Sequence, residues 1–241
     1  MSAAEAVSPK LLESFGKSIE DRLVSDLGAT PSERFSDLHD IKNLAGDSTG
    51  HVRTYEADKL DKACCLSVNV MPGARYFNIH IVPAAKYMIP RFGFEGMIST
   101  HGSQVSMDFY PDMDLVMRIQ EFADMCGDMT AIYDEVKKSD LPIQASRLMH
   151  MRAFCSPYFL NAPGSTAEQL PLLEETANRY FDEWLKIYNS ARELDADETA
   201  DRQKRRSHFA EKIIELDPDR KMIVQVYGEE VTDAIEDAMM R

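Results

Sequence analysis

The sequence predicts a single α+β domain, a three-layer α/β/α sandwich with a central, mainly antiparallel sheet flanked by helices. Two observations lead to this prediction. Short runs of alternating apolar and polar residues, typical of strands, follow one another from about residue 52 to residue 110. Segments with apolar residues at helical spacing lie before and after them, in sufficient number to cover both faces of a sheet. No repeat or linker divides the 241 residues, so we expect one domain.

The N-terminal part of the chain predicts a helix followed by an irregular stretch. Ser8 and Pro9 are typical of a helix start, and apolar residues follow at helical spacing. The sequence therefore predicts a helix over residues 9–27. We expect residues 1–8 and about 28–50 to be irregular.

Four predicted strands follow, each alternating between apolar and polar residues. The apolar positions are Leu66, Val68 and Val70, then Phe77, Ile79 and Ile81, then Phe92, Phe94 and Ile98, then Val105, Met107 and Phe109. The polar positions between them include Ser67, Asn69, Asn78, His80, Glu95, Ser99, Ser106 and Asp108. Because strand side chains alternate between faces, an antiparallel meander with a hairpin at residues 100–103 gathers this polar set on one surface. If helices cover that surface, its carboxyl groups are buried and their pKa values are shifted.

The rest of the chain predicts helices and one more strand. Asp112 begins a helical pattern that continues toward Val136. The apolar run at residues 149–160 predicts a fifth strand, and Ser165 and Glu168 have the spacing of a capping box before a long amphipathic helix. Further helices are predicted over residues 198–216, 220–226 and 229–240.

Composition and motifs argue against several classes of protein. The formal net charge of −14 opposes general nucleic-acid binding, and no apolar run approaches the roughly 20 residues that span a bilayer. The N-terminal segment does not resemble a secretory signal. The four cysteines lack metal-site spacing, and no nucleotide-cofactor or hydrolase motif occurs. An oxidoreductase with this sequence would therefore need an external electron donor.

The polar face holds the candidate chemistry. Glu95 and Asp108 lie on adjacent predicted strands and could share or shuttle protons. The alternative is that one or both acids lie at a sheet edge and pair with a lysine or arginine. Asn78 and His80 face the same way on the neighbouring strand, where a hydrogen-bonded structural histidine is the commoner role.

Several short segments, in their order along the chain, resemble the ferredoxin-dependent bilin reductases. They are PRFGFE at residues 90–95, FCSPYF at 154–159, ELDPDR at 215–220 and YGEEV at 227–231. Glu95 stands where the bilin enzymes carry aspartate, and the related red chlorophyll catabolite reductases have glutamate there. The predicted N-terminal helix, residues 107–111, and Arg152 four residues before Ser156 also resemble that branch of the superfamily. The resemblance covers about residues 10–240.

The resemblance implies an enzyme that reduces a linear tetrapyrrole lying between the sheet and the C-terminal helices. It implies no bound metal or flavin, and reduced ferredoxin as the electron donor. One-electron transfers would alternate with protonation of a substrate radical by acids of the pocket. The substrate is either red chlorophyll catabolite or a biliverdin-type bilin; a non-catalytic tetrapyrrole-binding or carrier protein is the alternative. We expect a soluble protein of the plastid stroma in a eukaryote or of the cytoplasm in a bacterium.

The resemblance also assigns residues. The two acids that matter most in these families fall on Glu95 and Asp217, although Asp219 competes with Asp217. Asn78 falls where phycocyanobilin-forming enzymes have histidine and several phycoerythrobilin-forming enzymes have asparagine, and Asp108 is a further catalytic candidate. The residues expected to bind substrate are His80, Phe94, Ser106, Arg147, Arg152, Phe154, Ser156, Asp219 and Lys221.

Basic residues give candidate contacts for anionic groups. Arg147, Arg152 or Lys221 could pair with the propionates of a tetrapyrrole. Because ferredoxins are acidic, the basic residues at 137–138 or 202–206 could bind one despite the net charge. On sequence alone, a solvated helix face is the ordinary interpretation of both runs.

Overall fold

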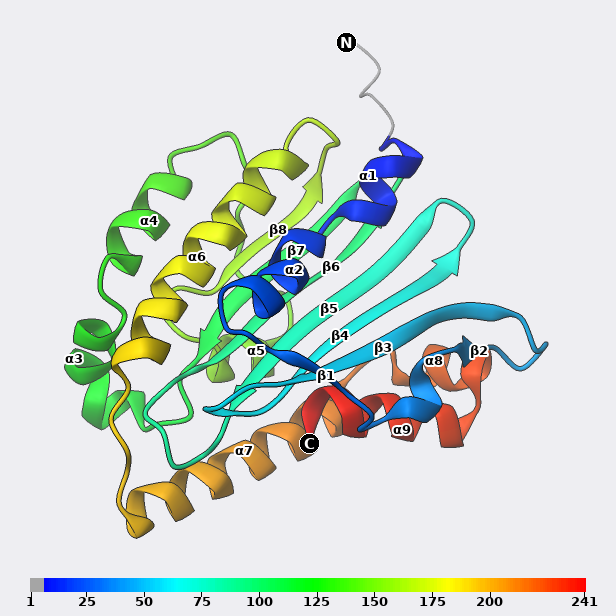
Figure 1. The fold of residues 1–241 in the computed structure, drawn as a ribbon. Coiled ribbons are helices and arrows are strands. Elements are labelled where there is room, and N and C mark those ends of the chain that lie inside the picture. The colour runs from blue at the N-terminus through cyan, green and yellow to red at the C-terminus, as the bar shows by residue number, and fades with distance from the viewer. Residues whose placement is uncertain (1–6) are drawn as a thin grey trace.

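A computed structural model describes residues 7–241 and confirms the predicted three-layer arrangement (Figure 1). Within these residues an eight-stranded antiparallel sheet has the order β1-β3-β4-β5-β6-β7-β8, with the short β2 paired to β3. The strands are β1 Thr30–Ser32, β2 Ile41–Lys42, β3 Ser48–Glu56, β4 Leu60–Met71, β5 Ala74–Pro83, β6 Arg91–Ser99, β7 Ser103–Tyr110 and β8 Leu160–Ser165. The predicted irregularity of residues 1–8 falls almost wholly outside the described residues.

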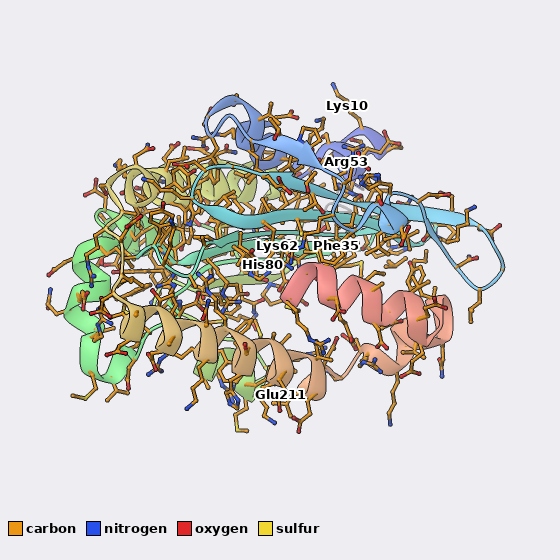
Figure 2. The ribbon with its side chains drawn as sticks, turned by 60° about the horizontal axis from the view of Figure 1, so that its bottom comes forward. Lys10, Phe35, Arg53, Lys62, His80 and Glu211 are labelled. Atoms are coloured by element: carbon orange, nitrogen blue, oxygen red, sulfur yellow. The ribbon has the colours of Figure 1, made fainter. Side chains whose placement is uncertain are left out.

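Helices cover both faces of the sheet. They are α1 Pro9–Ser14, α2 Lys17–Ser25, α3 Leu115–Met125, α4 Met129–Val136, α5 Met149–Phe154, α6 Leu170–Ser190, α7 Ala196–Leu216, α8 Arg220–Tyr227 and α9 Glu229–Met240, with a 3₁₀ helix η1 at Ser36–Leu38. The N-terminal helices and α6 lie on one face, and Figure 2 shows α7, α8 and α9 on the other. Among residues 7–241 no helix has the length and apolar character needed to cross a membrane.

The larger hydrophobic core lies between the sheet and the helices of the first face, which is the face covered by the N-terminal helices and α6. Apolar side chains of β5, β6 and β7 point into it, as the alternation predicts, and pack against α2, α4 and α6. Trp184 of α6 is fully buried, and its indole N–H donates a hydrogen bond to the Pro90 carbonyl at 2.8 Å. This bond satisfies the polar group of a buried aromatic side chain and fixes α6 against the start of β6.

The second face of the sheet is mixed, with an apolar part and a polar part. Asn78 pairs in register with Glu95 on β6 and with Leu66 on β4, so all three side chains share this face. The prediction that Leu66, Val68 and Val70 lie with the opposite, apolar set is therefore wrong. Leu66 and Val68 instead form a second, smaller core with α8 and α9.

Two N-terminal predictions need correction. The predicted helix over residues 9–27 is divided into α1 and α2 at Gly16, whose φ of 85° is strained for residues with a side chain. A Cβ at Gly16 would also come within 3.0 Å of the Phe77 ring. The stretch predicted to be irregular at residues 28–50 contains β1, η1, β2 and the first residues of β3.

The predicted strand at residues 149–160 is also wrong, because this run begins as helix α5 and extends only from Leu160 as β8. The helix ends at Phe154, because Cys155 after it has extended backbone angles. The predicted capping box does not form either. The Ser165 hydroxyl donates to the Ala162 carbonyl within β8, and α6 begins five residues later, at Leu170.

The helix predicted from Asp112 toward Val136 is divided into α3 and α4 near Gly127, whose φ is 55°. The remaining predicted strands and helices are confirmed with shifted ends. The hairpin at residues 100–103 joins β6 to β7, and Asp114 caps the N-terminus of α3 by accepting from the amide groups of Val116 and Met117. The last three predicted helices correspond to α7, α8 and α9.

Candidate active site

A cavity of about 70 Å³ lies between the polar part of the second face and the helices that cover it. Its lining residues are Asn78, His80, Gly93, Phe94, Glu95, Ser106, Met107 and Tyr110 from the sheet, and Met151, Phe209, Ile213 and Met240 from α5, α7 and α9. Small-molecule sites usually measure about 300–1,000 Å³, so the helical side must withdraw before a large ligand fits.

Glu95 is the carboxyl group of this cavity. Its Oε2 accepts hydrogen bonds from the Tyr76 hydroxyl at 2.9 Å and the Asn78 amide at 3.1 Å, and its Oε1 accepts from the Ser106 hydroxyl at 3.1 Å. Burial raises the pKa of Glu95, the hydrogen bonds from Tyr76 and Ser106 oppose this rise, and the negative charge of Asp217 adds to it. The net rise keeps a proton on Glu95 to higher pH than on an exposed glutamate, as a general acid requires.

Asp217 supplies a second carboxyl group beside the cavity. It ends α7, is partly buried, and accepts a hydrogen bond at 2.8 Å from the backbone amide of Asp219. Burial is the main cause of its raised pKa. Asp219 is exposed, whereas the charge of Asp217 raises the pKa values of Glu95 and Tyr76. Of the two competing aspartates, Asp217 is thus the one electrostatically coupled to Glu95.

His80 is buried on the same strand as Asn78. Its Nδ1 lies 2.5 Å from the backbone carbonyl of Met239 in the last turn of α9, and its ring meets the Tyr110 ring edge-on at 6.0 Å. Burial and the positive charge of Arg91 lower the pKa of His80 to about 3, so the imidazole is neutral at physiological pH. Figure 2 shows His80 and Lys62 between the sheet and α9.

Asp108 lies on this face but does not line the cavity. Its carboxylate accepts hydrogen bonds from the backbone amide of Ser156 at 2.8 Å and from the Ser156 hydroxyl at 2.5 Å. Burial raises the pKa of Asp108 to about 6 against the effect of these bonds. These hydrogen bonds hold the loop after α5 against β7, so both side chains have a structural role.

Of the remaining candidates, Ser106 and Phe154 lie on the cavity side of the sheet, and the side chain of Phe94 lies on the other side. Ser106 lines the cavity, and Phe154 packs its ring 5.5 Å from Phe209, one of the residues that cover it. The ring of Phe94 points into the larger hydrophobic core, where its centroid lies 5.0 Å from that of the Phe77 ring. Only the backbone of Phe94 therefore borders the cavity. A substrate contact through the Phe94 side chain is therefore ruled out in this arrangement.

The charged candidates for substrate binding lie outside the cavity. Arg147, Arg152, Asp219 and Lys221 are exposed. Arg152 donates to the Ser146 carbonyl at 3.1 Å. These residues lie in or beside α5 and α8, and the structure does not bring them to Glu95.

Sequence reasoning missed several residues of the site. Tyr76 and Tyr110 stand two positions from Asn78 and Asp108, so the period of two could have placed them on the polar face. The covering side chains Met151, Phe209, Ile213 and Met240 gave no such signal, because ordinary core positions on helices look the same.

The basic run at residues 202–206 is only partly exposed. Arg202 and Arg206 turn inward with Arg91 onto the buried carboxylate of Asp112. Arg91 and Arg206 each approach Asp112 to 2.7 Å, and Arg202 lies 3.7 Å away. This cluster, which we call the Asp112 cluster, fastens α7 to the sheet. The expectation that the whole run forms a surface for an acidic partner is therefore wrong for two of its arginines.

The sequence pattern of the ferredoxin-dependent bilin reductases matches residues 17–237. The chain belongs to this family. Its members are ferredoxin-dependent oxidoreductases of linear tetrapyrroles, and so is this bilin reductase. No curated protein matches the chain in sequence.

A solved structure of another protein shows the same fold. Phytochromobilin synthase from tomato, solved in complex with biliverdin, has a TM-score of 0.78 at 16% identity, and the match covers 92% of this chain and 81% of that one. A structure of PcyX has a TM-score of 0.47 at 14% identity, and the match covers 91% of each chain.

Proposed function

We propose that this bilin reductase reduces a biliverdin-type bilin bound in the cavity, with Glu95 as the proton donor and Asp217 as the second acid. The observation that carries the proposal is the environment of Glu95, a hydrogen-bonded carboxyl group with a raised pKa in the wall of a partly open cavity. The family match to bilin reductases favours a bilin over red chlorophyll catabolite, which stays the alternative substrate.

The proposed reaction is a reduction of one double bond by two electrons and two protons. Two reduced ferredoxins deliver one electron each, and two protons enter the substrate. One carbon–carbon double bond becomes a single bond with two new C–H bonds. Each electron leaves a charge that a proton must neutralise, so two acids with raised pKa values beside one cavity suit the sequence of steps. We propose that no flavin or metal takes part.

Ferredoxin would bind to exposed basic residues. Lys137 and Lys138 are exposed at the end of α4, in the layer that does not cover the cavity. Lys204 is exposed on α7, which covers the cavity. Because electrons must reach the bilin, we favour the surface around Lys204, and the salt dependence of the reduction rate would report on such a contact.

The first experiment mixes purified protein with biliverdin under anaerobic conditions and records the absorption spectrum before and after a ferredoxin reducing system is added. We expect a red-shifted bound spectrum that is replaced by blue-shifted products. Binding without reduction would favour red chlorophyll catabolite as the substrate or a carrier role, and repeating the assay with that catabolite separates these two. No binding of either compound would refute the proposal.

Variants test the two acids. Glu95→Gln keeps an acceptor for Ser106 but removes the transferable proton, and we expect kcat to fall about 10²–10⁴-fold while the bound spectrum persists. Asp217→Asn should also slow turnover, with bilin binding retained. Glu211→Gln, an exposed change on α7, is the control and should leave turnover unchanged. Wild-type turnover by Glu95→Gln would remove Glu95 from the mechanism.

A further inference from the structure

The two ring nitrogens of His80 have different surroundings. Nδ1 lies 2.5 Å from the Met239 carbonyl oxygen, which can only accept a hydrogen bond. Nδ1 must therefore carry the ring proton, and in the neutral imidazole Nε2 is left as an acceptor with a free lone pair. The carbonyl of α9 thus selects the tautomer of His80.

Nε2 has no hydrogen-bond partner anywhere in residues 7–241, although it is buried. The residue is 4% exposed and lines the cavity together with Asn78 and Glu95. Its partners across the sheet are Gly93 on β6, which has no side chain, and Cys64 on β4, whose thiol pairs with the Thr54 hydroxyl instead. Buried polar atoms without a partner are rare in proteins, and one at a cavity wall indicates a group that a ligand completes.

We propose that His80 binds the tetrapyrrole by accepting a hydrogen bond at Nε2 from a pyrrole or lactam N–H of the substrate. This inference rests on the proposed function and adds the direction of one hydrogen bond, in which the substrate donates and His80 accepts. Linear tetrapyrroles carry N–H donors along one edge, and His80 offers them a neutral acceptor beside Glu95. Because the imidazole stays neutral, His80 positions the substrate and does not act as an acid.

Two variants separate the roles of the two nitrogens. His80→Asn places an amide N–H where Nδ1 was, so it can keep the bond to Met239, but nothing replaces Nε2. His80→Gln places a carbonyl oxygen at the distance of Nε2 from the backbone and loses the bond to Met239. If Nε2 contacts the substrate, biliverdin should bind about 3- to 10-fold more weakly to His80→Asn than to wild type, and His80→Gln should retain more of the affinity. A purely structural role predicts the reverse order of the two variants.

The measurement is anaerobic titration of each variant with biliverdin, followed by absorption. It is combined with ¹⁵N spectra of the imidazole in the wild-type protein. We expect the free protein to show the Nδ1–H tautomer and the Nε2 signal to shift when biliverdin binds. Equal affinity of His80→Asn and wild type, or an Nε2 signal unchanged by binding, would overturn the inference while leaving the proposed function intact. Failure of the wild type to bind any tetrapyrrole would instead refute the proposed function.

Discussion

Replacing Asp112 with asparagine removes the charge that holds the Asp112 cluster together. The carboxylate and the side chains of Arg91 and Arg202 are no more than 3% exposed, and that of Arg206 is 13% exposed. Asparagine suits the backbone here, because φ of Asp112 is 49° and asparagine tolerates left-handed angles as well as aspartate does. The substitution therefore adds no backbone strain to the loss of charge.

The expected effect is large. Removing one partner of a buried ion pair costs about 3–5 kcal/mol, because the remaining charge stays buried without compensation. Here three guanidinium groups lose their shared counter-charge, and the amide nitrogen of asparagine would face the Nε donor of either Arg91 or Arg206. We expect the free energy of unfolding of Asp112→Asn to fall by about 3–5 kcal/mol.

Urea denaturation followed by far-UV circular dichroism measures this loss. The matched control is Asp201→Asn, which breaks an exposed pair with Arg205 one turn away on α7 and should change stability by no more than about 0.5 kcal/mol. The arginines hold the pKa of Asp112 well below its usual range, so its contribution is present above about pH 4 and lost as the pH falls further. The difference between wild type and Asp112→Asn should therefore shrink below that pH. A loss below about 1 kcal/mol at pH 7 would refute the reasoning.

Two further substitutions have predictable outcomes. Burial raises the pKa of Asp108 from 3.8 to about 6, so the stability of the wild type relative to Asp108→Asn should decrease by up to about 3 kcal/mol as the pH rises from 4 to 7, and a flat difference in urea titrations would contradict this. In Gly93→Ala the new Cβ would lie 2.7 Å from Cε2 of Tyr110 and push that ring out of place. We expect the free energy of unfolding to fall by about 1–3 kcal/mol and biliverdin to bind more weakly. Unchanged binding and thermal stability would show that the Tyr110 ring moves aside without cost and would contradict this prediction.

The sequence is most informative where a strand has one polar and one apolar face. The alternation predicts that Asn78 and Glu95 share a surface, and the register places them directly opposite each other. The prediction fails on β4, where Cys64 and Cys65 are both buried because both faces are covered. Alternation does not reveal orientation in such a strand.

Contacts between residues that are far apart in the sequence could not be predicted either. Arg202 and Arg206 are four residues apart and so share one face of α7, but their partner Asp112 lies about 90 residues earlier in the chain. No local pattern links these positions. Likewise, the short apolar run at residues 149–160 is compatible with either a strand or a helix, and only the packing of α5 against α7 decides between them.

The contacts that hold α9 on the sheet also affect the pKa of Glu95. Lys62 holds the end of this helix by donating to the carbonyls of Asp237 and Ala238, next to the Met239 carbonyl bound by His80. The strands fix where Glu95 stands, but its raised pKa depends on the exclusion of water by the helical cover. A substrate that displaces this cover must itself keep water away, so the bound tetrapyrrole helps to raise the pKa of its own proton donor.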